Sequence, residues 1–144
     1  MKKTVIAHFL AAALSLMTVA SDWRETPLEK LNYAVQHLGS SRGELGYEAK
    51  QRNFDYRRNL LWAIDGKRDA VVALCEFTIA DVPATAARQH GAVLASLLRH
   101  FGDNLFSGAL RDCRPPVRRR VLSALDLQPS SDWRRTYPKT AQLR

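Results

Sequence analysis

The sequence contains few of the residues from which catalytic and metal sites are built. It has two cysteines and four histidines, and neither an HExxH nor a CxxC pattern occurs in it. Those patterns are typical of zinc sites and of reactive thiol pairs. His90 and His100 are ten residues apart, which is about 1000° of helical rotation, so one helix cannot present both to a single site. We therefore expect neither an enzyme nor a metal or cofactor site.

Acidic residues are scarce relative to basic ones. The chain has 14 Asp and Glu against 22 Lys and Arg, a formal charge of +8. So basic a chain would suit nucleic acid, but the export signal described next argues against that partner. Acidic protein, lipid head groups and cell-wall carboxylates remain. Arginine dominates the cations and binds carboxylate or phosphate in two-pronged contacts, although a GC-rich genome would give the same composition.

Residues 1–20 form a short basic and apolar leader. Two lysines precede an apolar stretch from Val5 to Val19, and small residues precede Ser21. This order is typical of a cleavable secretory signal. The stretch is shorter than the roughly 20 residues that span a bilayer, and a retained membrane anchor is the alternative interpretation. With cleavage near Ala20, we expect a bacterial periplasmic or secreted protein with a formal charge of +6, because the leader takes two lysines with it.

A convincing β-strand is absent too, and apolar residues recur instead at helical spacing. Thr26 and Glu29 form a capping box at a helix start, and the glycine-rich stretch 39–46 predicts a loop after that helix. Gly102 predicts a left-handed break, and Asp103 is expected to cap the helix that follows. Helices are expected over residues 27–38, about 47–64, about 71–79, 84–101, 103–113 and 116–128, with an irregular tail from about 128. This predicts one all-α domain of about six antiparallel helices, a bundle or a short stack of helical hairpins.

The two cysteines, Cys75 and Cys113, both lie on apolar faces of predicted helices. The face that contains Cys75 also includes Val71, Leu74, Thr78 and Ile79. In an exported chain an even pair of cysteines predicts a disulfide. The bond would close a loop of about 38 residues and stabilise the fold by about 4 kcal/mol. Two buried free thiols are the alternative.

The segments SDWRET (residues 21–26) and SDWRRT (residues 131–136) are nearly identical, but the residues after them diverge. We interpret them as the same turn chemistry used twice, in which Trp23 and Trp133 each pack onto the body of the fold and hold a chain end. The alternative is an exposed Trp133 in a binding surface, since arginine with aromatic residues is typical of interface anchors. The residues predicted to contact a partner are Arg111, Arg114, Arg118, Arg119, Arg120, Trp133, Arg134, Arg135 and Tyr137.

In size, export signal, helical content and paired cysteines, the chain resembles the periplasmic immunity proteins that neutralise cell-wall-degrading toxins of rival bacteria. The resemblance is one of class and covers no diagnostic motif. It implies steric blockage, in which basic and aromatic side chains from the last third of the chain lie over an acidic cleft. The alternative is an envelope-associated structural or stress protein that binds anionic lipid or lipopolysaccharide through the same arginines.

Overall fold

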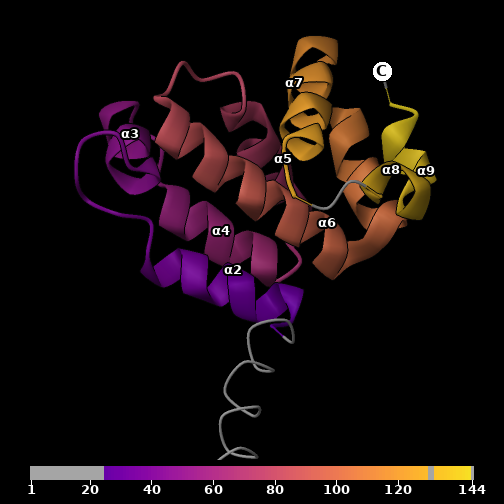
Figure 1. Cartoon of the computed structure of the whole chain (residues 1–144), viewed down its shortest axis with the longest axis horizontal. Helices are drawn as coiled ribbons and strands as arrows, with labels where there is room; N and C mark the ends of the chain where they lie inside the picture. Colours follow the sequence, from indigo (N-terminus) through magenta and orange to yellow (C-terminus); the bar gives the residue numbers. More distant parts are fainter. Residues whose placement is uncertain (1–24, 130–131, 144) are drawn as a thin grey trace, which may run out of the picture.

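The computed structural model describes residues 25–129 and 132–143, and every regular element within them is a helix (Figure 1). The helices are α2 (Pro27–Gln36), α3 (Leu45–Gln51), α4 (Tyr56–Ile64), α5 (Arg68–Phe77), α6 (Ala84–Asp112), α7 (Pro115–Asp126), α8 (Trp133–Thr136) and α9 (Pro138–Ala141). The predicted all-α class is confirmed, with eight helices in the described ranges. The expected signal segment and Trp23 lie outside the described residues.

Helix α6 is the centre around which the other helices pack. It contacts α2, α3, α5, α7 and α9, and six successive residues in its middle, Val93–Leu98, are all buried. This middle stretch has no solvent face, so neighbouring helices must surround it. Figure 1 shows α3 at one end of the molecule and the short helices α8 and α9 at the other.

Local chemistry explains where α2 begins. Thr26 accepts a hydrogen bond from the Glu29 N–H, and the Glu29 carboxylate accepts one from the Thr26 N–H, which completes the predicted capping box. Leu31 and Val35 on the inner face of the helix are buried. The first predicted helix is therefore confirmed, although it ends slightly earlier than expected, at Gln36.

The helix predicted over residues 47–64 is wrong, because two helices occupy this range. Helix α3 ends at Gln51, and the chain then passes through Asn53, which has a φ of 55°. Asparagine enters this left-handed region more readily than most residues. Asp55 then caps α4 by accepting the Arg58 N–H at 3.0 Å. Apolar residues recur at regular spacing on both sides of this break, so the sequence pattern predicted one continuous helix.

The predicted break at Gly102 is confirmed. Its φ of 76° and ψ of 176° interrupt the helical backbone inside α6 and divide it into two segments. Only glycine adopts such angles without steric cost.

Asp103 caps a helix other than the one predicted. Its carboxylate accepts the backbone N–H groups of Lys139 at 2.8 Å and Thr140 at 2.7 Å, in the first turn of α9. Partial burial opposes ionisation, but these two N–H groups outweigh it and lower the pKa of Asp103. The tail expected to be irregular therefore contains two short helices, and a long-range cap holds the second of them.

Replacing Asp103 by asparagine is expected to lower the free energy of unfolding by roughly 1–2 kcal/mol, because an amide accepts these bonds less strongly than a carboxylate. Urea unfolding measures this change, and hydrogen exchange should show faster opening of α9. The matched control is Asp132→Asn, which changes an exposed carboxylate for which no side-chain hydrogen bond to a described residue is found. Equal stability of the two variants would contradict the capping role.

Candidate docking groove

A groove of about 480 Å³ lies between the end of α5, the first half of α6 and the second half of α7. The segment after α5 forms one wall, since α5 ends at Phe77 and the chain reaches α6 only at Ala84. Arg120, Ala124 and Leu127 form the opposite wall, because residues three and four positions apart share one face of a helix. The walls of the groove therefore carry both apolar and cationic side chains.

Close contact between α6 and α7 closes the end of the groove. Gly91 on α6 is buried, and a Cβ atom at this position would lie 2.5 Å from the Gln128 side-chain nitrogen and 3.4 Å from the Ala124 carbonyl oxygen. Glycine therefore allows the two helices to approach.

A charged network holds the wall that follows α5. The Arg52 guanidinium donates to the backbone carbonyl of Asp81 in that wall and forms an ion pair with Glu48 at 2.9 Å. Glu48 also accepts the Gly43 N–H at 2.9 Å. The hydrogen bond from Arg52, followed by that from Gly43, lowers the pKa of Glu48. These contacts tie the wall to α3, so the groove has a fixed shape rather than a free loop on one side.

A buried polar chain lies beneath the groove. The His90 imidazole is hydrogen-bonded through Nδ1 to the Tyr56 hydroxyl at 2.6 Å and through Nε2 to the Thr78 hydroxyl at 2.9 Å. Burial lowers the pKa of His90 to about 3 and raises that of Tyr56 well above its usual value. Both groups are therefore neutral near pH 7. A histidine with so low a pKa and with both nitrogens engaged is a poor general base, so we assign this chain of groups to support of the groove.

Exposed apolar side chains line the mouth of the groove. Ile79 is 44% exposed and Leu127 is 82% exposed. The prediction that Ile79 lies on a buried helix face is wrong, because α5 ends two residues before it. Arg88 and Arg120 lie beside these side chains and form no ion pair with any residue in the described ranges, while Asp81 is the one carboxylate among the lining residues.

The structure divides the predicted partner-binding arginines into two groups. Arg114 forms an ion pair with Glu76 at 2.8 Å, and Arg134 binds Asp126 with two hydrogen bonds of 2.9 and 2.7 Å. These two are used within the fold. Arg118 is half-buried, and its Nε has no hydrogen-bond partner within the part of the chain that the structure covers. The predicted arginines that are exposed and have no ion pair with a described residue are Arg111, Arg119, Arg120 and Arg135.

The aromatic residues of the predicted surface lie inward. Trp133 is only 6% exposed, and Tyr137 is half-buried beside it. This placement corresponds to the clamp interpretation of Trp133 and not to an exposed anchor. Between the two tryptophans of the described residues, the one that reaches solvent is Trp62 on α4, which is 41% exposed and has Arg58 and Lys67 over its ring at 5.1 and 4.5 Å. Sequence reasoning missed it, because nothing in the spacing of α4 separates Trp62 from a core residue.

The predicted disulfide is wrong for this structure, since Cys75 and Cys113 are both buried free thiols. The hydrogen bond between them raises the pKa of Cys75, with burial adding to the effect, and lowers the pKa of Cys113. The Cys113 thiol also lies 3.6 Å from the Ala109 carbonyl oxygen. Two adjacent thiols can fill this part of the core as small apolar side chains, which is the alternative that the sequence left open.

No protein-family model, curated protein or solved structure matches this chain. Within residues 25–129 and 132–143 no helix has both the length and the apolar character needed to cross a bilayer. In the same ranges no three His, Cys, Asp or Glu side chains are grouped as a metal site would require. The function therefore has to be argued from the geometry of the groove.

Proposed function

We propose that this chain is an exported binding protein that docks an acidic, partly apolar segment of another protein in the groove between α5, α6 and α7. The observation that supports this most is the combination of exposed Ile79 and Leu127 with Arg88 and Arg120 around a groove of about 480 Å³. Neither arginine has an ion-pair partner among the described residues.

The two kinds of side chain would have complementary roles. An apolar side chain of the partner would remove Ile79 and Leu127 from water, which is the main source of affinity in such contacts. Partner carboxylates would receive two-pronged hydrogen bonds from Arg88 and Arg120. The fixed wall and the buried support beneath the groove would reduce the ordering cost of binding, because little of the groove must rearrange.

Arginines outside the groove would act at longer range. Arg111, Arg119 and Arg135 are exposed, and such rim charges mainly accelerate encounter with an acidic partner. Together with the expected export, this is the behaviour of an inhibitor or immunity protein that blocks an acidic cleft by covering it. Trp133 and Arg134 make contacts within the fold, so we assign partner binding to the groove and to these exposed arginines instead.

Variants of the groove lining test the groove as the docking site. Arg88→Glu combined with Arg120→Glu is expected to weaken partner binding roughly 100-fold. Each replacement removes the cation that would pair with a carboxylate of the partner and leaves that carboxylate unpaired. Ala87→Trp should have a similar effect by filling the groove, since Ala87 is exposed and lines it. The measurement is co-purification of the tagged chain from a periplasmic extract of its host, followed by titration calorimetry with the recovered partner.

Two control variants alter other surfaces. Trp62→Ala changes the exposed aromatic residue on α4, and Ala92→Trp changes an exposed position elsewhere on α6. Both are expected to retain the partner. Recovery of the chain alone at low salt, or equal binding by the groove variants and the controls, would contradict the proposal. Binding to vesicles of anionic lipid that is lost between about 50 and 300 mM salt would instead support the envelope alternative.

A further inference from the structure

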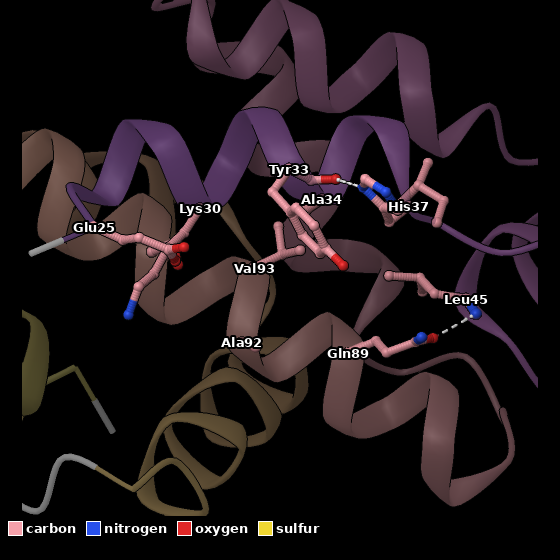
Figure 2. Close-up of a pocket in the computed structure, with 11 residues that line it drawn as sticks. Glu25, Lys30, Tyr33, Ala34, His37, Leu45, Gln89, Ala92 and Val93 are labelled. Carbon is pink, nitrogen blue, oxygen red and sulfur yellow. Dashed lines mark hydrogen bonds between the residues drawn. The ribbon is translucent and has the colours of Figure 1, made fainter. Parts of the chain in front are cut away.

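A second hollow, of about 280 Å³, lies between α2 and α6 and shares no lining residue with the docking groove (Figure 2). We propose that it binds a small neutral molecule of one or two aromatic rings that carries a single hydroxyl or N–H group. The volume is at the lower end of what small-molecule sites enclose, which restricts the ligand to about this size. The inference is independent of the proposed protein partner.

Aromatic and apolar groups make up most of the wall. The rings of Tyr33 and His37 stack with their centroids 3.9 Å apart and their planes 13° from parallel. His37 Nδ1 is hydrogen-bonded to the Tyr33 carbonyl oxygen at 2.9 Å, which keeps the imidazole in this position (Figure 2). Ala34 and Val93 complete the lining nearby. A flat ligand can therefore contact ring faces and methyl groups together.

The opposite end of the hollow is fixed by a long-range hydrogen bond. Gln89 on α6 accepts the backbone N–H of Leu45 at 2.8 Å, at the first residue of α3 (Figure 2). This bond occupies the Gln89 oxygen and satisfies one of the free N–H groups at the start of that helix. The hollow is thus a preformed space between three helices.

The hydroxyl of Ser96 is the feature of the hollow that indicates a polar group on the ligand. It lines the hollow, is only 6% exposed, and its hydroxyl makes no hydrogen bond to any described residue. This hydroxyl is not among the fully buried polar atoms that lack a partner in the described residues, which are Arg118 Nε and Thr140 Oγ1. It is therefore accessible from the hollow, where a ligand group can form a hydrogen bond with it. A ligand hydroxyl or ring N–H next to Ser96 would complete this hydroxyl's hydrogen bonding.

The open end of the hollow favours a neutral ligand. Glu25 and Lys30 both border it (Figure 2), so a charged ligand would meet one attractive and one repulsive group. Neither sign of charge is selected by such a pair. The neutral aromatic class is therefore preferred over an aromatic acid or amine.

The test uses phenol and toluene, two molecules of nearly the same shape of which only phenol has a hydroxyl. In a ¹H–¹⁵N NMR titration of the full chain, phenol is expected to bind with a Kd of roughly 0.1–1 mM, which is typical of a one-ring ligand. Ser96→Ala should weaken phenol roughly fivefold to tenfold and leave toluene unchanged or slightly tighter. That difference separates a contact with the ligand from a general loosening of the fold.

Blocking variants locate the binding. Ala92 is exposed and lines the hollow, so Ala92→Trp should abolish phenol binding, whereas Ala87→Trp in the docking groove should leave it intact. The proposal is overturned if phenol does not bind, if Ala92→Trp binds as well as the unaltered chain, or if Ser96→Ala weakens phenol and toluene equally. Phenol binding that appears only in Trp23→Ala would also overturn it, because the chain's own indole would then be the occupant.

Discussion

Replacing Trp133 by alanine is expected to lower the free energy of unfolding by about 3–5 kcal/mol, the usual cost of deleting a buried aromatic side chain. The indole is almost fully buried next to Leu98 and Leu125, where a cavity of only about 10 Å³ remains. Tightly packed neighbours relax only partly into the space that the substitution leaves, so a cavity would remain. Thermal unfolding should report a fall in Tm of about 10 °C or more.

Polar contacts add to this packing. The indole Nε1–H donates to Asp126 at 3.1 Å, and the Arg134 guanidinium binds the same carboxylate while it lies 4.7 Å from the indole ring centre. Removal of the indole would therefore also loosen the Arg134 side chain, because the ring face and the carboxylate position it together. We expect α8 to lose protection from hydrogen exchange before the rest of the fold.

Trp62→Ala is the matched control, since it deletes the same side chain at an exposed site. It should lower the free energy of unfolding by about 1–2 kcal/mol at most, which corresponds to the loss of two exposed cation–π contacts. If Trp133→Ala melted like the unaltered chain and bound its partner less well, Trp133 would be an interface residue and the clamp assignment would be wrong.

Predictions from sequence succeeded where the deciding chemistry is local. The capping box at Thr26 and the break at Gly102 are both present, because a cap or a left-handed glycine depends on residues within one turn. The prediction failed at residues 47–64, where apolar spacing continued across a turn. Asn53 and Asp55 were the local signals for that break, and both are residue types that favour turns and caps.

Long-range contacts explain what the sequence did not indicate. Asp103 caps α9, 36 and 37 residues away, and Arg134 is neutralised by Asp126 on another helix. No pattern along the chain shows which arginine meets which carboxylate, so the predicted basic surface mixed internal and exposed cations. The docking groove was missed for the same reason, since its walls come from three helices and one connecting segment.

Because the imidazole of His90 is buried, we expect the free energy of unfolding to fall markedly in mild acid. Burial lowers its pKa to about 3 in the folded chain, compared with about 6.5 when the chain is unfolded. Above pH 6.5 the imidazole is neutral in both states and has no effect on the pH dependence. Below pH 6.5 only the unfolded chain takes up the proton, so the free energy of unfolding decreases as the pH falls, until the folded imidazole itself protonates near pH 3.

The expected slope is about 1.4 kcal/mol per pH unit, which gives a loss of about 2 kcal/mol between pH 6.5 and pH 5. Carboxylates with lowered pKa values, Glu48 and Asp103, contribute their own losses only at lower pH, where the unfolded carboxyl groups begin to protonate. The range from pH 6.5 to pH 5 therefore isolates the histidine. Urea unfolding at intervals across this range measures the slope.

His90→Gln provides the comparison that assigns the slope to this residue. Glutamine does not titrate, and its amide can meet at most part of the hydrogen bonding that Tyr56 and Thr78 now receive from the imidazole. The variant should be less stable than the unaltered chain at pH 7 and nearly independent of pH down to pH 5. An unaltered chain with no slope between pH 6.5 and 5, or a variant that keeps the full slope, would show that the imidazole is not held neutral in the core.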